Sequence, residues 1–143
     1  MERKKYGETG FQSQKSIKIL GILFKNGMEE TIKINGKMMH DKIKGKCIQA
    51  MNREFTLTQR ILFTNTYVTP IIINTASILP IPKMITNELE KIISNFIWTK
   101  QHERLAKEEC YPRIKDGGLG IVSVHAKARA HYAHTLLKQY LSD

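Results

Sequence analysis

The stretch KMITNELEKIISNFIW, residues 83–98, decides the fold class of this chain. Its apolar residues recur at i, i+4, i+7, i+8 and i+11, the spacing of one helical face: Ile85, Leu89, Ile92, Ile93 and Phe96. The Pro80-Ile81-Pro82 segment before it ends any preceding helix. The stretch therefore predicts a helix that buries one side against the rest of the molecule.

Two further helices are predicted upstream. The first runs from Lys37 to about Arg53, and its apolar face is formed by Met39, Ile43, Cys47, Ala50 and Met51. The second begins after Phe55, where Thr56 or Thr58 can cap it. Pro70 is expected to kink or divide this second helix.

The N-terminal part has a different pattern. Residues 1–15 are polar and predict a flexible leader, and the apolar run at 17–24 predicts a strand. Lys25-Asn26-Gly27 predicts a turn, and the alternation at 31–34 predicts a second strand, ended by Asn35-Gly36. The expectation is a small β-hairpin over residues 16–36.

The C-terminal part returns to helix. Residues 99–122 predict loop or short strand, and a last helix is expected from Ser123 to Leu141. Its buried face is predicted to be Ala126, Ala130, Ala133, Leu137 and Leu141. The fold class is thus mainly α: the hairpin, then a bundle of about four to five helices within residues 37–143.

The charge balance narrows the choice of partners. Among 143 residues, 23 Lys and Arg stand against 13 Asp and Glu, a net charge of +10. Such a surplus favours polyanions, nucleic acid before an anionic membrane. The uncharged stretch 61–82 is long enough for a bilayer, but Asn and Thr residues interrupt it, so no membrane partner is expected. The alternative is a basic surface that binds nothing.

Two rows of polar and basic residues follow helical spacing. One comprises Lys42, Lys46, Gln49 and Arg53, and the other Lys127, His131, His134 and Lys138. Several cations along one rigid element suit a phosphate backbone, which they would bind without sequence preference. An ordinary solvated helix face remains the alternative for each row.

Catalysis is not expected from this chain alone. Its aspartates, at 41, 116 and 143, are scattered, whereas a two-metal polymerase or nuclease needs convergent carboxylates. Cys47 and Cys110 form neither a disulfide framework nor a zinc motif, so no cofactor or metal is predicted. A reduced intracellular protein, cytoplasmic or nuclear, is the expectation.

Two local features favour packing over ligand binding. Gly117-Gly118-Leu119-Gly120 matches neither the dinucleotide fingerprint nor the P-loop, so its glycines are predicted to allow tight turning and close packing. Trp98 could stack on a base, but packing beneath the segment 117–121 is favoured.

Four motifs in order resemble the end of LINE-type (non-LTR) retrotransposon reverse transcriptases. SIKILGI at 16–22 is similar to that family's K-Y-L-G strand, and FTLTQRI at 55–61 to its L-S-L-x-G-R-I helix start. ILPIP at 78–82 with Phe96-Ile97-Trp98 matches its L-P … F-I-W pair. KDGGLGI at 115–121 resembles K-E-G-G-L-G-L and precedes a helix of small residues.

The resemblance covers Ile17 to Leu137 and implies a thumb and post-thumb region, which grips the template–primer duplex of RNA and DNA beside the catalytic palm domain. It implies phosphate contacts from Lys42, Lys46, Arg53, Arg60, Lys127 and Lys138. Gln59 stands where the family usually has glycine, and the catalytic Y-x-D-D motif is missing. The chain is therefore expected to be a non-catalytic fragment of an RNA-directed DNA polymerase. The alternative is an inert or decayed helical interaction module.

Overall fold

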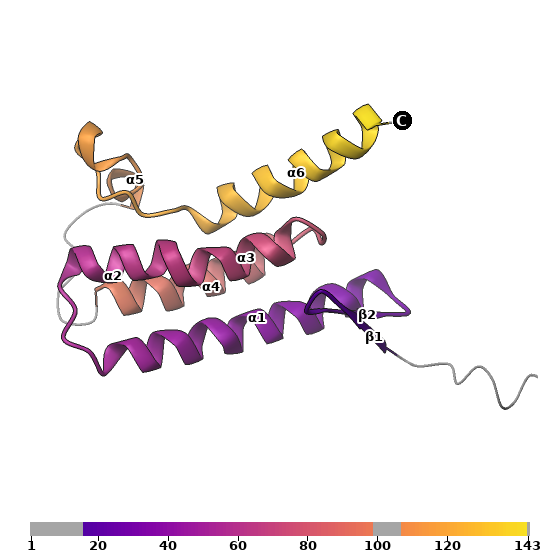
Figure 1. The fold of residues 1–143 in the computed structure, drawn as a ribbon, viewed down its shortest axis with the longest axis horizontal. Coiled ribbons are helices and arrows are strands. Elements are labelled where there is room, and N and C mark those ends of the chain that lie inside the picture. Colours follow the sequence, from indigo (N-terminus) through magenta and orange to yellow (C-terminus); the bar gives the residue numbers. More distant parts are fainter. Residues whose placement is uncertain (1–15, 99–106, 143) are drawn as a thin grey trace, which may run out of the picture.

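The structure, a computed structural model, describes residues 16–98 and 107–142. The predicted leader at 1–15 and the start of the predicted loop at 99–106 lie outside these residues. A hairpin of two strands precedes the helices (Figure 1), as the sequence predicts: β1 (Ser16–Ile19), β2 (Ile22–Lys25), α1 (Met28–Met51), α2 (Leu57–Phe63), α3 (Thr69–Ala76), α4 (Lys83–Ile97), the short α5 (Lys107–Cys110) and α6 (Val124–Ser142). The mainly α fold class is confirmed.

The hairpin is shorter than predicted and turns within the apolar run. β1 and β2 are antiparallel, with Ile19 opposite Ile22, so Leu20 and Gly21 form a two-residue loop. Both have positive φ, 50° and 83°, as a type I′ hairpin turn requires. The sequence predicts one strand over 17–24, but the apolar residues there form parts of both strands and the turn between them.

The predicted second strand at 31–34 is wrong, because these residues lie in α1. Side-chain hydrogen bonds of Thr31 and of the adjacent Asn35 explain why a helix is stable here. Asn35 accepts a hydrogen bond from Leu23 N (3.0 Å) and donates to Leu23 O (2.7 Å). Thr31 Oγ1 accepts from Lys25 N (2.9 Å). The start of α1 therefore completes the outer edge of β2 with side chains, and the hairpin ends at residue 25 instead of 36.

The prediction that Asn35-Gly36 ends a strand is also wrong, because both residues lie within α1. Gly36 faces α4, and a Cβ at this position would lie 2.7 Å from Cδ1 of Ile85. The glycine thus allows α1 and α4 to approach closely, which offsets its poor helix propensity of about 1 kcal/mol relative to Ala.

The second predicted helix is divided before Pro70, as expected. Thr56 caps α2 through a capping box with Gln59. A π-helical turn, η1 (Thr64–Val68), joins α2 to α3, and Pro70 lies in the first turn of α3. Because proline lacks an N–H and crowds the preceding turn, a wider turn before it relieves the clash.

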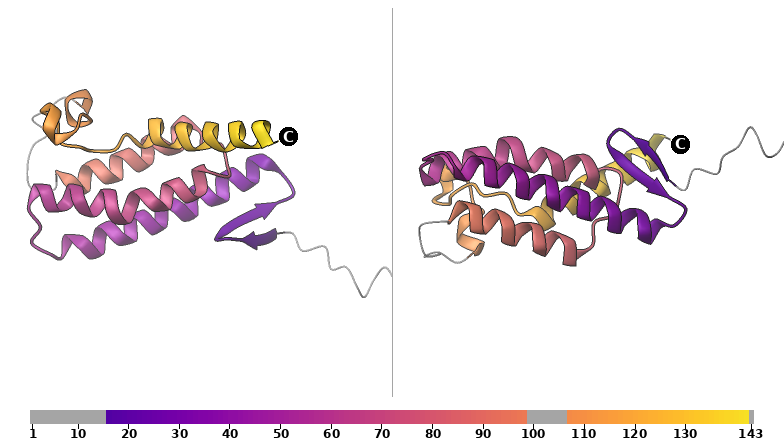
Figure 2. Two further views of the ribbon diagram at one scale, coloured as in Figure 1. Left: turned by 45° about the horizontal axis from the view of Figure 1, so that its top comes forward. Right: turned by 90° about the horizontal axis from the view of Figure 1, so that it is seen from below.

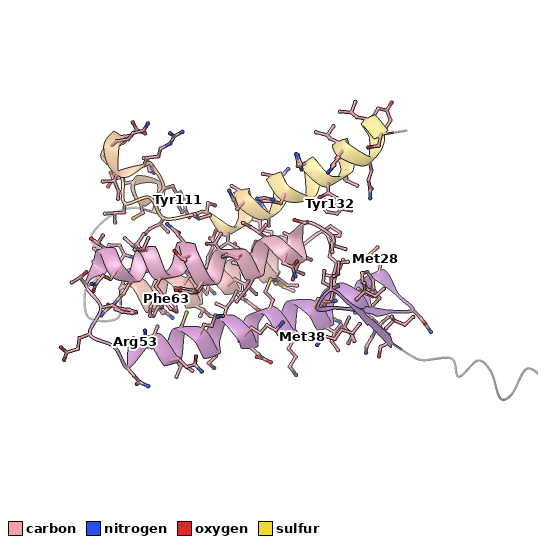
Figure 3. The ribbon with its side chains drawn as sticks, viewed as in Figure 1. Met28, Met38, Arg53, Phe63, Tyr111 and Tyr132 are labelled. Carbon is pink, nitrogen blue, oxygen red and sulfur yellow. The ribbon has the colours of Figure 1, made fainter. Side chains whose placement is uncertain are left out.

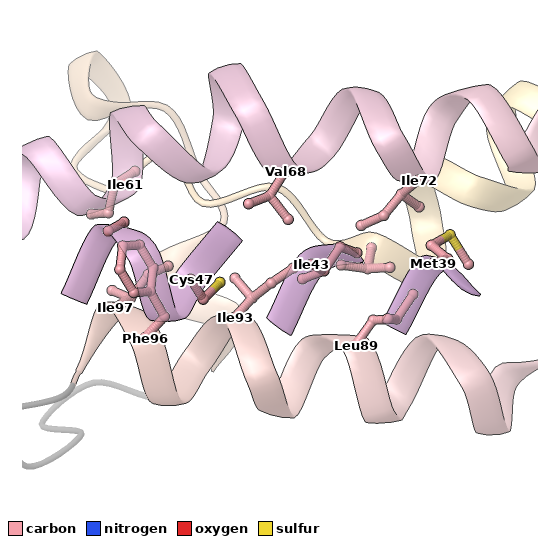
Figure 4. Close-up of a cluster of buried hydrophobic side chains, with 12 residues drawn as sticks. Met39, Ile43, Cys47, Ile61, Val68, Ile72, Leu89, Ile93, Phe96 and Ile97 are labelled. Atoms are coloured by element: carbon pink, nitrogen blue, oxygen red, sulfur yellow. The ribbon is translucent and has the colours of Figure 1, made fainter. Parts of the chain in front are cut away.

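The core lies between α1, the α2–α3 segment and α4 (Figure 4), and Figure 2 shows these helices from two further sides. Its fully buried side chains include Ile43 of α1, Ile72 of α3 and Leu89 of α4. The predicted face of α1 is buried at Met39, Ile43, Cys47 and Ala50, whereas Met51 is exposed. On α4, Leu89, Ile93 and Phe96 are buried, and Ile85 and Ile92 pack against the core.

The last helix is present, but its predicted buried face is wrong. α6 packs on α3 and α4 through the opposite side, where Val124 and Ala128 are buried. The predicted residues are all exposed: Ala126, Ala130, Ala133, Leu137 and Leu141. Figure 1 shows α6 diverging from α3 toward its C-terminal end. The second half of α6 therefore has few neighbours, and its leucines remain on the surface.

Candidate nucleic-acid interface

Three of the predicted phosphate-binding residues lie along α1 and just beyond its end. Lys42 and Lys46 are one helical turn apart, beside the buried face of α1, and Arg53 lies two residues after Met51, the last residue of the helix. Lys42 and Arg53 are exposed, and Lys46 is half-buried. The helix and the residues directly after it therefore present three cations in sequence, which we call the α1 row.

The α1 row borders a groove of about 600 Å³ between the end of α1 and the α2–η1 segment. Lys46, Gln49 and Arg53 line one side, and Gln59, Leu62, Phe63, Thr66 and Tyr67 line the other. No acidic side chain is among these lining residues. In Figure 3, Phe63 and Arg53 lie at the end of the molecule where α1 leads into α2. The groove therefore combines positive charge with apolar surface.

Aromatic rings connect this groove to the core. The ring centroid of Phe63 lies 5.6 Å from that of the buried Phe96, 6.0 Å from that of Phe55 and 5.1 Å from that of Tyr67. Tyr67, at the open end of this series, is 55% exposed. Because η1 carries it and the core holds Phe63, the tyrosine is both accessible and fixed in position.

Lys46 contacts the exposed tyrosine. Its Nζ lies 5.8 Å from the centroid of the Tyr67 ring, at the outer limit of a cation–π interaction. At an exposed site such a contact contributes only about 0.5–1 kcal/mol. A phosphate group can therefore draw the ammonium away from the ring at little cost.

Lys42 borders a second, smaller hollow. This space of about 110 Å³ is lined by Gly21 of the hairpin turn, by α1 and by Asn74 and Thr75 of α3. The α1 row thus follows the seam between α1 and the α2–α3 segment along much of its length.

Arg60 does not join the α1 row. It is half-buried, and its Nη1 donates a hydrogen bond to the carbonyl oxygen of Ile97 (3.2 Å) at the end of α4. A cation at this position stabilises the carbonyl end of a helix dipole. The arrangement assigns Arg60 a structural contact between α2 and α4.

The second predicted row lies elsewhere. Lys127 and Lys138 are exposed on α6, and Figures 1 and 2 show α3 between α6 and α1. His131, within this row, is half-buried. The two rows therefore form separate basic surfaces.

The buried cysteine next to Lys46 is not an activated nucleophile. Burial raises the pKa of the Cys47 thiol to about 11. At neutral pH the thiol is therefore protonated, whereas nucleophilic chemistry requires the thiolate.

The glycine run packs closely, as predicted. A Cβ on Gly118 would collide with the carbonyl oxygen of Pro112, and the N–H of Gly120 donates to that same oxygen (2.9 Å). Asn65 Nδ2 of η1 donates to Gly120 O (2.9 Å). The segment is therefore folded against its neighbours at Gly118 and Gly120, whereas Gly117 is exposed.

Trp98 is half-buried and packs against the core. It lines a cavity of about 40 Å³ together with Ile121, next to the glycine run. The predicted packing of Trp98 at this segment is confirmed.

Two kinds of feature are missing from the described residues. Within 16–98 and 107–142, every helix is too short or too polar to cross a bilayer. The same ranges bring no three His, Cys, Asp or Glu side chains together as a metal ion would need.

The aromatic side of the groove was missed by sequence reasoning. Phe55, Phe63 and Tyr67 lie close in sequence, and this density of rings opposite the α1 row is a usable signal. Phe63 and Tyr67 are four residues apart, the spacing of one helical face, so periodicity predicts their contact but not the side of α1 that they face.

Neither a protein-family model nor a curated protein sequence matches the chain.

Proposed function

We propose that the chain binds a nucleic-acid duplex by its phosphate backbone, as the thumb of the LINE-type reverse transcriptases that it resembles does. The observation that carries this proposal is the α1 row: Lys42 and Lys46 on one rigid helix and Arg53 just beyond its end, bordering a groove with no acidic lining residue. Cations held on a rigid element bind phosphates without reading bases. In this role the chain is a non-catalytic fragment of an RNA-directed DNA polymerase and binds the template–primer duplex.

The exposed side of the hairpin suits a palm domain as neighbour. Ile17 and Ile19 are each 54% exposed, and Leu20 is 80% exposed. In the proposed context this apolar surface packs on the palm, and the protein acts in the cytoplasm or the nucleus, where its nucleic acid is found.

The test is binding to a labelled RNA–DNA hybrid across a salt series. For the wild-type chain we expect affinity to fall steeply with salt and to be similar for unrelated sequences. The triple variant Lys42→Glu/Lys46→Glu/Arg53→Glu should lower the slope of log K against log salt by about three, one for each lost phosphate contact.

A matched control is available on the same helix. Lys33, Lys37 and Lys44 are exposed on the opposite side of α1, so Lys33→Glu/Lys37→Glu/Lys44→Glu makes the same change in net charge. The control triple should retain most of the affinity. Equal losses in both triples would mean that net charge alone drives binding, and no loss in either would remove the proposed interface.

A second function, protein interaction through α6, is favoured by a separate observation. Leu137 and Leu141 are 60% and 80% exposed on the side of α6 that faces away from the bundle. A chain that stays folded but binds no hybrid at low salt would leave this helical interaction module as the better description.

A further inference from the structure

We infer that the groove between α1 and the α2–η1 segment binds an unpaired nucleotide, with its base stacked on Tyr67 and its phosphate held by Lys46 and Arg53. This inference rests on the proposed function, since it assumes a nucleic-acid ligand. It goes further by assigning a single-stranded segment to the groove beside the duplex, with Lys46 and Arg53 shared between the two.

The chemistry of the lining favours a nucleotide. One side of the groove supplies two cations, and the other supplies the exposed ring of Tyr67 backed by Phe63. Proteins that bind single strands combine these two elements, a positive groove along the backbone and aromatic rings for the bases. The volume of about 600 Å³ is typical of small-molecule sites.

A paired base cannot use this ring. Within a duplex each base is stacked between its neighbours, so its flat faces are not accessible to a side chain. An unpaired base exposes those faces, and Gln49 and Thr66 supply side-chain hydrogen-bonding groups at the groove for its edges. The groove therefore suits a strand end or an overhang beside the duplex.

The charge of the groove argues against an apolar protein segment as its occupant. Lys46 and Arg53 would be left beside apolar side chains without an anion, which costs affinity when charges lose water. A nucleotide meets both requirements: its phosphate supplies the missing negative charge, and its base stacks on the ring of Tyr67.

The experiment compares three RNA–DNA hybrids with the same paired region: a blunt one, one with a short single-stranded tail, and one whose tail is abasic. The abasic tail keeps the phosphates and lacks the bases. We expect the normal tail to raise affinity roughly tenfold over the blunt hybrid, and the abasic tail to give much less.

The gain from the bases should depend on Tyr67. Tyr67→Ala should abolish it and leave blunt-hybrid binding unchanged, and Tyr67→Phe, which keeps the ring, should retain it. Tyr140→Ala, which removes an 81% exposed tyrosine from α6, is the matched control and should have no effect. A fluorescent base analogue in the tail should be quenched by the wild type and not by Tyr67→Ala.

The two proposals fail in different ways. Blunt-hybrid binding with no gain from the tail, or an equal gain from the abasic tail, would overturn the nucleotide site and leave duplex binding intact. An equal loss for blunt and tailed hybrids in Tyr67→Ala would assign the groove to the duplex, which also overturns the inference. No binding of any hybrid would overturn both proposals.

Discussion

Helices α1 and α6 each carry apolar residues at helical spacing next to a row of basic residues, and the fold uses the two helices differently. α1 buries Met39, Ile43, Cys47 and Ala50 against α3 and α4. α6 exposes its longest apolar row and packs through Val124 and Ala128. Periodicity thus identifies a helix, but burial depends on which neighbours are present.

The course of α6 accounts for part of the difference. Ala128 and Thr135 lie on the packed side, where short side chains let the helix approach α3 and α4 closely. Leu137 and Leu141 lie in the second half of α6, which diverges from α3 (Figure 1), so they remain exposed.

The largest expected effect contrasts a buried apolar residue of α1 with an exposed apolar residue of α6. Ile43→Ala should lower the free energy of unfolding by about 2–5 kcal/mol, because it leaves a cavity in the core. Leu137→Ala should change it by less than about 0.5 kcal/mol, because that side chain is 60% exposed. Urea denaturation followed by circular dichroism measures both. A comparable loss in the two variants would show that α6 buries its outer row in solution, in an assembly for example.

A smaller effect is expected where the hairpin anchors the start of α1. Asn35→Ala should cost about 1–3 kcal/mol, because it leaves the N–H and carbonyl of Leu23 without their partner. Amide hydrogen exchange should then show faster exchange at Leu23 and throughout the hairpin. Asn74→Ala, at an exposed asparagine of α3, serves as the control and should change neither quantity appreciably. Unchanged exchange at Leu23 in Asn35→Ala would mean that the hairpin does not depend on this anchor.

The smallest effect tests how much helix propensity at an exposed position contributes to stability in α1 and in α6. Gly45 is exposed in α1 with no atom within 4 Å of a Cβ added there, so Gly45→Ala should stabilise the fold by about 0.5–1 kcal/mol. Ala130→Gly makes the reverse change at an exposed position of α6. Its cost should be smaller than the gain at Gly45, since the outer half of α6 has few contacts and can fray by itself. Thermal unfolding of both variants provides the measurement, and an equal cost at Ala130 would show that α6 unfolds together with the core.

Much of the fold could be predicted from local patterns. The spacing of Leu89, Ile93 and Phe96, the cap at Thr56 and the break before Pro70 each depend on neighbouring residues, and each prediction is confirmed. The errors involve contacts distant in sequence. Thr31 to Ile34 alternates like a strand, yet hydrogen bonds from Thr31 and Asn35 to β2 favour helix.

The candidate site was predictable in part for the same reason. Lys42 and Lys46 share one helix, so their common flank follows from spacing alone, whereas Arg53 lies beyond the end of that helix. The groove does not follow from spacing, because it needs α2 and η1 placed beside α1. Spacing also does not show the hydrogen bond from Arg60 to the carbonyl of Ile97, because the two residues are distant in sequence.

The bonds from Thr31 and Asn35 to β2 also limit how this protein could aggregate. A two-stranded sheet usually offers two edges for pairing with other copies, which permits growth of a fibril. Here side chains already occupy the outer edge of β2. Among the described residues each copy therefore has one unpaired strand edge, that of β1, so it can pair with only one other copy. Strand pairing between copies would end at a four-stranded dimer.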